Sequence, residues 1–378
     1  MVIIWAALLA WGIFLLQRIV YRRLWREGVA VLLMFDKDTV RAGEEVKLLE
    51  IVENRKRLPL SSLKVKFQCS RYLEFSDGTN SSVTDRYYRN DLFSMRSYQR
   101  ITRTHNISCP KRGYYGIYGI DLVGADLFFS EEMVASLSSE TILYVLPKKL
   151  PYDQITQAVR RINGEIINRR YEIEDPFTYR GIREYQPYDE LKTINWKATA
   201  RTDELKVNMR ENTSVSGVRI FMNLEDNGIL RREELLELCI SLCSGIAEYL
   251  LQEGVRLSVY ANAGDCISGR KLQMEELVDQ VSLKSLYKAL ARLDLNSPME
   301  KFADAFREKL AEEKEVLYTI FLSPDIHEDY QKVLAKYQAG REKKKDFIWI
   351  CPVKKEGEQE IFPVLREYVM FIKDSDRM

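Results

Sequence analysis

The chain has 378 residues, which is long enough for two domains of ordinary size, each with its own hydrophobic core. Its 57 lysines and arginines almost balance its 56 aspartates and glutamates, so the composition excludes a strongly basic protein and predicts no nucleic-acid partner. Only two histidines are present, which excludes most zinc sites and any mechanism that needs several imidazoles.

Residues 1–21 are predicted to form a transmembrane anchor. The apolar run from Val2 to Leu16, extended at residues 19–21, supplies about the 20 residues that a bilayer core requires. Arginines flank its C-terminal end, so the positive-inside rule predicts a single-pass protein of the cell membrane whose soluble domains face the cytoplasm. Six scattered cysteines without a CxxC pair agree with a reducing compartment. The alternative is a cleaved signal peptide, but no positive side chain precedes the run and no A-x-A site follows it.

Residues 29–146 are predicted to form a β-sandwich domain. Short runs rich in Val, Ile, Leu, Tyr and Phe are broken by turn residues at intervals of about 8–12 residues, as in sandwich folds. The clearest predicted strands are Val46–Val52, Leu63–Cys69, Tyr98–Asn106 and Tyr114–Val123. No catalytic constellation is recognisable in this region, so we expect it to have a structural or binding role.

Residues 147–180 are predicted to be a connector between two domains. The segment begins with Pro147 and Pro151 and continues through a helical pattern from Tyr152 to Ile167. The stretch that follows, residues 181–210, has no clear strand or helix period. Its acidic and basic side chains are balanced and interleaved with aromatic and amide groups, which favours a network of ion pairs and hydrogen bonds over a one-sided phosphate-binding groove.

Residues 211–378 are predicted to form a doubly wound α/β domain. A strand over Val218–Leu224 is expected to form a hairpin with the strand Leu205–Met209. An amphipathic helix over Arg232–Gln252 follows, and strands and helices then alternate, including a helix near Met274–Leu293. This alternation is typical of a mostly parallel sheet that is covered on both faces.

Oxygen-bearing side chains follow two strands of this domain, where ligands of open α/β sheets bind. Asn223, Glu225, Asn227 and Asp325 could hold Mg²⁺ through direct and water-mediated contacts. The alternative is that they are ordinary turn and helix-capping residues. A hydrolase that uses Glu225 and Asp325 is disfavoured because no motif positions a nucleophile or an oxyanion hole.

The central stretch carries a specific resemblance. It contains the groups Arg183-Glu184-Tyr185-Gln186-Pro187, Asp189, Ile194-Asn195-Trp196-Lys197 and Ala200-Arg201-Thr202, followed by Leu205 and Val207. This pattern resembles the signature of the DUF58 proteins, a bacterial family. The resemblance implies an N-terminal membrane segment, a β-rich region and a von Willebrand factor A-like domain after the signature. The chain departs from the family at Tyr188, which replaces a glycine, and at Asn223–Asn227, where N-L-E-D-N replaces the metal motif D-x-S-x-S. Only one membrane segment is readable, where many members have a pair.

The resemblance implies an association with MoxR-type AAA+ ATPases and carries over no catalytic residue, so we expect a non-enzymatic, membrane-anchored scaffold or adaptor without a cofactor. Its expected partner is a protein, with MoxR-type AAA+ ATPases as candidates, in assembly or maturation related to the cell envelope. The signature side chains either clamp the connector to the α/β sheet or form the docking surface for this partner; they are Arg183, Glu184, Tyr185, Asp189, Asn195, Trp196 and Arg201. The alternative function is a metal-dependent ligand-binding protein that uses the degenerate site at the strand ends.

Overall fold

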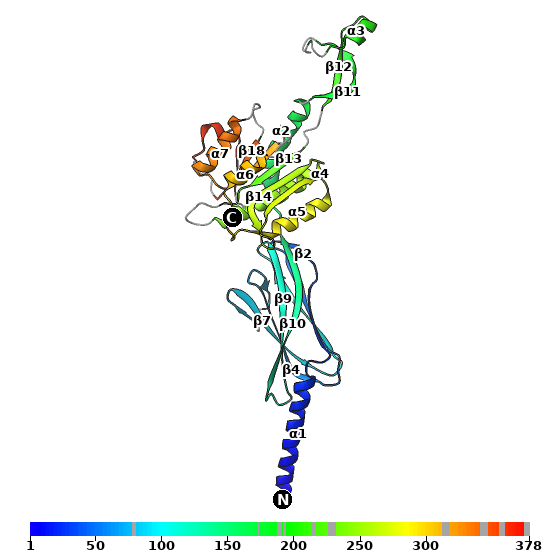
Figure 1. The fold of residues 1–378 in the computed structure, drawn as a ribbon, viewed down its shortest axis with the longest axis vertical. Coiled ribbons are helices and arrows are strands. Elements are labelled where there is room, and N and C mark those ends of the chain that lie inside the picture. Colours follow the sequence, from blue (N-terminus) through cyan, green and yellow to red (C-terminus); the bar gives the residue numbers. More distant parts are fainter. Residues whose placement is uncertain are drawn as a thin grey trace. The chain divides into compact units, whose positions relative to one another are not determined.

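The protein divides into two compact units, Met1–Lys149 and Leu150–Met378 (Figure 1). The computed structural model describes residues 1–77, 81–172, 174–186, 191, 194–212, 217–225, 232–311, 318–340, 347–354 and 360–373. The boundary lies close to the predicted end of the β-sandwich at residue 146. Each unit contains its own hydrophobic core, as the length of the chain led us to expect.

The first unit consists of one helix and two β-sheets. Its elements are α1 (Val2–Leu24), β1 (Val29–Phe35), β2 (Thr39–Arg41), β3 (Glu45–Asn54), β4 (Leu60–Ser70), β5 (Glu74–Phe75), β6 (Ser81–Val83), β7 (Arg86–Met95), β8 (Arg100–Ser108), β9 (Gly113–Ala125) and β10 (Glu132–Leu146). One sheet has the order β1-β3-β8-β5 and the other β2-β10-β9-β4-β7-β6. The predicted strands at 46–52, 63–69, 98–106 and 114–123 are confirmed as β3, β4, β8 and β9.

Alternation explains why these strands pack as two layers. Along β7 every second residue is buried, so one face of the strand lies in the core and the other is exposed. Leu48 and Val52 of one sheet belong to the same core as Leu63 and Val65 of the other. The sequence signal was clear here because a half-buried antiparallel strand shows its period directly.

Helix α1 is anchored in this core. It extends three residues beyond the predicted end of the anchor, and Tyr21 and Trp25 are buried among the sandwich side chains. Tyr21 donates a hydrogen bond to the Pro59 carbonyl (2.9 Å), and the Lys56 ammonium donates to the carbonyls of Leu24 (2.6 Å) and Trp25. The helix therefore continues past residue 21, the predicted end of the anchor, and its last turn packs on the sandwich.

The second unit is a mixed α/β structure. Its elements are α2 (Tyr152–Glu172), β11 (Glu174–Glu184), α3 (Trp196–Thr202), β12 (Lys206–Asn212), β13 (Val218–Met222), α4 (Glu233–Gln252), β14 (Leu257–Asp265), β15 (Lys271–Leu277), α5 (Gln280–Arg292), β16 (Leu293–Asp294), α6 (Phe302–Ala311), β17 (Tyr318–Leu322), α7 (Glu328–Ala339), β18 (Phe347–Val353), the short 3-10 helix η2 (Pro363–Leu365) and β19 (Val369–Lys373).

Its main sheet has the strand order β15-β14-β13-β17-β18-β19, and β16 pairs with β14. All neighbours in the path are parallel except β15, which is antiparallel to β14. Strands β13 and β17 are buried at every position, as expected of parallel strands covered on both faces. The order reverses between β13 and β17, and the open edge at the carboxyl ends of these two strands is the place where α/β proteins bind ligands.

Two predictions about this unit were wrong, and a third concerns the connector. The strand at 205–209 pairs not with β13 but with β11, in an antiparallel hairpin, while β13 pairs in parallel with β14 and β17. The helix expected near 274–293 is strand β15 followed by α5, which begins after the capping box of Asp279 and Ser282. The helical pattern predicted at 152–167 within the connector is confirmed as part of α2, whose Ala158 and Ile162 are buried. Local periodicity does not encode which surface an element packs against.

Candidate functional site

The signature forms a hairpin with a short helix at its end. Strands β11 and β12 pair so that Glu184 lies opposite Lys206, and the backbone N–H of Tyr185 donates to the carbonyl of Leu205 (2.9 Å). The backbone N–H of Asn195 donates to the Lys206 carbonyl (2.8 Å), which closes the loop onto β12. Helix α3 follows directly, so the structure brings the signature residues 183–186 and 194–207 together in one small element.

Asn195 is the residue that organises this tip. Its side-chain oxygen accepts a hydrogen bond from the backbone N–H of Ala198 (2.9 Å) and caps α3, while its amide nitrogen donates to Oδ1 of Asn208 (2.6 Å). At the other end of α3, Asp203 adopts a left-handed conformation with φ +58°, which ends the helix. Both contacts fix the position of Trp196, the first helical residue.

Large apolar side chains of this hairpin are exposed. Trp196 is 67% exposed, Leu191 70% and Leu205 43%. The side chain of Glu184 is 70% exposed, and the guanidinium of Arg183 donates to the Glu184 carbonyl (3.0 Å). The exposure of Trp196 and Glu184 fits the predicted docking surface better than the predicted clamp, which stays a prediction for the signature as a whole. Arg201 is likewise exposed. Asp189 lies outside the described residues.

The ion pairs of the hairpin add little to its stability. Lys206 lies 3.0 Å from Glu204 and 3.4 Å from Glu184, and both carboxylates are mostly exposed. The hydrogen bond that Lys206 donates to Glu204 raises the pKa of Lys206. Exposed pairs of this kind are screened by water and salt.

The predicted metal ligands at the strand ends are engaged within the chain. The Asn223 amide donates to the Ser323 hydroxyl (3.2 Å), and its oxygen accepts hydrogen bonds from the Asn262 amide (3.0 Å) and from the Glu225 backbone (3.1 Å). Asn223 and Ser323 are fully buried. The prediction that these strand ends lie together is confirmed, but their polar groups form a hydrogen-bonded network.

The carboxylates of Glu225 and Asp325 bond outside that network, although the backbone N–H of each residue donates into it. Oε2 of Glu225 accepts the backbone N–H of Phe302 (3.2 Å) near the start of α6. Oδ1 of Asp325 accepts the backbone N–H of His327 (2.9 Å) and lies 2.5 Å from its ring Nδ1, at the start of α7. Both therefore act as turn and capping residues, as the alternative interpretation expected. Asn227 lies outside the described residues.

A cavity of about 620 Å³ lies beside these strand ends. Its walls include the aromatic rings of Phe221, Tyr260 and Phe306. The lysines at its rim are compensated, because Lys271 forms an ion pair with Glu300 and Lys309 lies 3.5 Å from Glu275. Its described lining contains no nucleophile next to a base, so the cavity supports binding of an apolar group better than catalysis.

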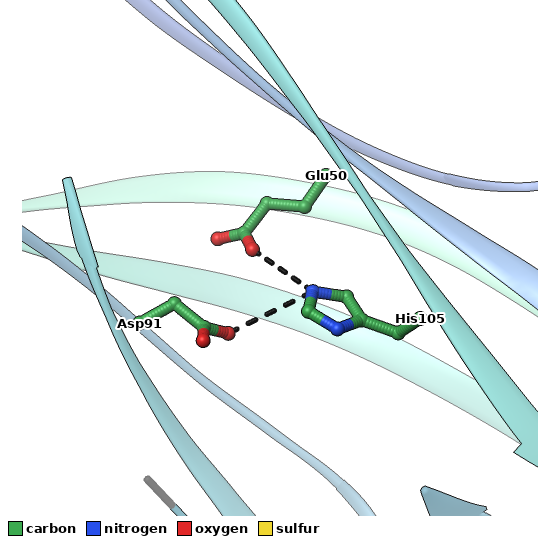
Figure 2. Close-up of side chains that lie close together, drawn as sticks. All are labelled: Glu50, Asp91 and His105. Atoms are coloured by element: carbon green, nitrogen blue, oxygen red, sulfur yellow. Dashed lines mark hydrogen bonds and ion pairs between the residues drawn. The ribbon is translucent and has the colours of Figure 1, made fainter. Parts of the chain in front are cut away.

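A second polar cluster, which the sequence analysis missed, is buried between the two sheets of the first unit (Figure 2). Glu50 of β3, Asp91 of β7 and His105 of β8 are at most 3% exposed, and their ligand atoms lie within 4.8 Å of one another. Figure 2 shows Nε2 of His105 between the two carboxylates, at 3.1 Å from Glu50 and 3.8 Å from Asp91. No other set of three His, Cys, Asp or Glu side chains in the described part of the chain meets this distance.

Two arginines, Arg89 and Arg103, also contact the cluster and make it unsuitable for a metal ion. Asp91 lies 2.6 Å from Arg89 and 2.9 Å from Arg103 through different oxygens. These guanidinium groups occupy the acceptor positions that a metal ion would need and repel it. Burial and the charge of Asp91 raise the pKa of Glu50, although the hydrogen bond with His105 opposes this shift. The arrangement fits an ionic link between the sheets better than a metal centre.

A signal for this cluster is present in the sequence. Residues 87, 89, 91, 93 and 95 share one face of β7, and their order is Tyr, Arg, Asp, Phe, Met. Two charges on the apolar face of an alternating strand indicate a buried pair, because isolated buried charges are too costly. The partners Glu50 and His105 come from other strands, so only the tertiary fold reveals them.

Neither a family model nor a curated protein matches the chain. Among solved structures, AvmM, which catalyses macrocyclization in alchivemycin A biosynthesis, is 8% identical and covers 33% of this chain and 94% of its own, with a TM-score of 0.24. A non-cellulosomal cohesin from Archaeoglobus fulgidus is 9% identical and covers 31% and 91%, with a TM-score of 0.21. A CARDB domain from Pyrococcus furiosus, in complex with di-metal ions, is 16% identical and covers 30% and 90%, with a TM-score of 0.20. These scores are too low to bear on function.

Proposed function

We propose that this protein is a non-enzymatic, membrane-anchored adaptor that binds a protein partner through the tip of the β11–β12 hairpin. The observation that carries the proposal is the exposure of Trp196, which is 67% exposed on a helix held in place by Asn195. Leu191 and Leu205 add apolar surface, and Arg201 adds charge. Exposed aromatic and arginine side chains are the residue types enriched at interface hot spots.

The partner we propose is a MoxR-type AAA+ ATPase, in a process related to the cell envelope. This follows from the resemblance of the signature to the DUF58 family, to which we propose that the chain belongs. The strand order β15-β14-β13-β17-β18-β19, with an antiparallel first edge, supports assigning the second unit to the von Willebrand factor A-like class. The hydrogen-bonded strand ends support a member of this class that binds its partner without a metal.

We propose that α1 anchors the protein in the cell membrane with both units in the cytoplasm. By length and composition α1 is able to cross a bilayer, and it is the one described helix that is. A cleaved signal sequence passes the same test, but cleavage after α1 would remove the buried Tyr21 from the sandwich core. Arg22 and Arg23 in its last turn support the cytoplasmic orientation.

The hairpin proposal is tested by binding of a purified MoxR-type ATPase from the same genome to the detergent-solubilised full chain. We expect Trp196→Ala to weaken binding at least tenfold, because truncation of a hot-spot aromatic typically costs about 2 kcal/mol or more. Tyr152→Ala is the matched control, since Tyr152 is an exposed aromatic of the same unit (78%) outside the hairpin. Equal binding of the wild type and Trp196→Ala, or no binding of the ATPase at all, would refute the proposal.

The alternative, a metal-dependent ligand-binding protein, has less support because the oxygens of Asn223, Glu225 and Asp325 accept hydrogen bonds within the chain. Calorimetric titration with Mg²⁺, Mn²⁺ and Ca²⁺ distinguishes the two functions. The adaptor proposal expects no heat of specific binding. Heat that disappears in both Glu225→Ala and Asp325→Ala would favour the alternative.

A further inference from the structure

We propose that the turn between β9 and β10, with Leu127, Phe128 and Phe129 at its tip, is a second membrane-contact site that inserts into the bilayer beside α1. This inference rests on the proposed anchoring by α1. Figure 1 shows α1 leaving the sandwich at the end where β9 and β10 are joined by this turn. No residue of the turn belongs to the hairpin, the strand-end network or the buried cluster described above.

The tip of the turn is apolar and exposed. Leu127, Phe128 and Phe129 are 45%, 60% and 66% exposed, and they are consecutive. Single exposed apolar residues are common on soluble proteins, but three adjacent large ones, two of them aromatic, indicate a surface that is covered by something else. Phe129 adopts a φ of +54°, an uncommon conformation for an aromatic residue, so the backbone is held in a defined turn.

The contact between the turn and α1 indicates what binds the exposed apolar tip. The ring of Phe128 packs against the ring of Phe14 with centroids 5.8 Å apart, and Phe14 lies within the apolar run of α1. Because Phe128 lies beside Phe14, the two rings have the same depth in the membrane when α1 crosses it. That depth is within or just below the lipid headgroups. The partner of stated chemistry is therefore a lipid bilayer.

Polar contacts hold the turn at this depth. The Gln17 amide donates to Asp126 (2.8 Å), and Arg18 pairs with Glu131 (2.7 Å). The buried Asp126 also accepts hydrogen bonds from the backbone N–H of Ser130 (2.6 Å) and from its hydroxyl (2.7 Å), which brace the turn internally. The turn is thus fixed to α1 on both flanks of its apolar tip.

The order of these contacts along α1 matches the polarity of a membrane interface. At a rise of 1.5 Å per residue, Arg18 lies about 6 Å from Phe14 along the helix. The aromatic pair is on the side of the apolar run, and the ionic pair is on the side of Arg22 and Arg23. Aromatic rings that insert by about 5–10 Å with cations behind them are typical of interfacial membrane anchors.

Depth-dependent quenching of single labels tests this inference in the full chain. Cys266 is the exposed cysteine among the six, so Cys266→Ser provides a background in which the remaining five are buried. An environment-sensitive fluorophore is attached through Leu9→Cys in α1, Phe128→Cys in the turn, or Leu92→Cys on the exposed face of β7. Each protein is reconstituted into phosphatidylcholine and phosphatidylglycerol vesicles with or without nitroxide-labelled acyl chains.

We expect blue-shifted emission and severalfold quenching for the labels at positions 9 and 128, and neither at position 92. Strong quenching at position 9 with an unquenched, water-like label at position 128 would overturn the inference and leave the α1 anchor intact. An unquenched label at position 9 would overturn both proposals. A blue-shifted label at position 128 that lipid nitroxides do not quench would overturn the inference in favour of a second copy of the chain as the occupant.

Discussion

Two regions of this molecule use the same kinds of charged side chains in opposite environments. In the first unit, Arg89 and Asp91 are 2.6 Å apart and the side chain of each is 1% exposed. In the hairpin of the second unit, Lys206 and Glu184 are 3.4 Å apart and the Glu184 side chain is 70% exposed. The low dielectric of the core strengthens the first pair, whereas water and salt screen the second. The buried pair contributes to the fold of the sandwich. The exposed charges of the hairpin contribute little to the fold and are accessible to the partner in the proposed function.

The largest effect on this comparison is expected from Asp91→Ala. Removal of one partner of a buried ion pair typically costs about 3–5 kcal/mol, because the other charge stays buried without compensation. Besides Asp91, Arg89 contacts the carboxylate of Asp77, which is 3.4 Å away and more exposed, and Arg89 would also keep its hydrogen bond to the Asp77 carbonyl (3.0 Å). Denaturant unfolding of the solubilised chain, with hydrogen exchange of the sandwich amides, measures the loss. The double variant Arg89→Met/Asp91→Leu should recover much of it, and a double variant as unstable as Asp91→Ala would contradict the electrostatic cause.

A pH-dependent effect is expected from Glu50→Gln. Burial and Asp91 raise the pKa of Glu50 above its usual value of 4.5. The folded state then binds the proton more tightly than the unfolded state, so this contribution to stability is present below about pH 4.5 and is lost as the pH rises through the folded-state pKa. The stability of the wild type relative to Glu50→Gln should therefore decrease with increasing pH, by at most about 1.4 kcal/mol per pH unit. Unfolding of both proteins between about pH 4 and 8 measures the difference, and a constant difference would show that Glu50 does not titrate as inferred.

A smaller, local effect is expected from Asn195→Ala in the hairpin. Loss of a helix N-cap costs about 1 kcal/mol, and the hydrogen bond to Asn208 is lost as well. Hydrogen exchange should become faster in α3 and β12 while the sheet amides are unchanged. Thr202→Ala is a suitable control, since its hydroxyl bonds only to backbone carbonyls near the end of α3. Destabilisation of the whole second unit by Asn195→Ala would show that the hairpin is more integral to the fold than its exposure indicates.

The smallest effect is expected from Glu184→Gln. An exposed ion pair such as Lys206–Glu184 contributes about 0–1 kcal/mol. The free energy of unfolding should therefore change by only a few tenths of a kcal/mol. The same denaturant experiment measures it, at low and high salt. A cost comparable to that of Asp91→Ala would remove the distinction between the two regions.

Much of the fold was predictable because local patterns report burial directly. The alternation in β3 and β4 identified two sandwich strands, and the regular spacing of apolar residues in α4 predicted a helix, on which Cys239 and Cys243 are buried. The pairing of β12 with β11 was not predicted, because only the tertiary fold shows that β13 lies between the parallel strands β14 and β17. Packing of α2 on the α/β unit depends on a distant surface, including Gly245, where the Ile155 side chain leaves no room for a Cβ.

The candidate sites show the same division. The rule that parallel strands end at one edge correctly brought Asn223 close to the strand end at Ser323, but it could not show that Asn262 would engage the Asn223 oxygen. The signature was found as a motif, while its exposure depends on the absence of packing around Trp196, which no periodicity encodes. The residues of the buried cluster come from three strands of two sheets. The sequence around His105 therefore gave no reason to expect Glu50 beside it.

The burial of Tyr21 and Trp25 has a mechanical consequence. No flexible linker separates α1 from the sandwich, because the Lys56 ammonium holds the last carbonyls of the helix and the indole of Trp25 fills the space above Gly124, where a Cβ would lie 2.5 Å from the ring. In the anchored protein that we propose, a tilt or rotation of α1 is transmitted to the sandwich as a rigid body. The orientation of the first unit then depends on the tilt of α1, and so on the lipid environment that sets this tilt.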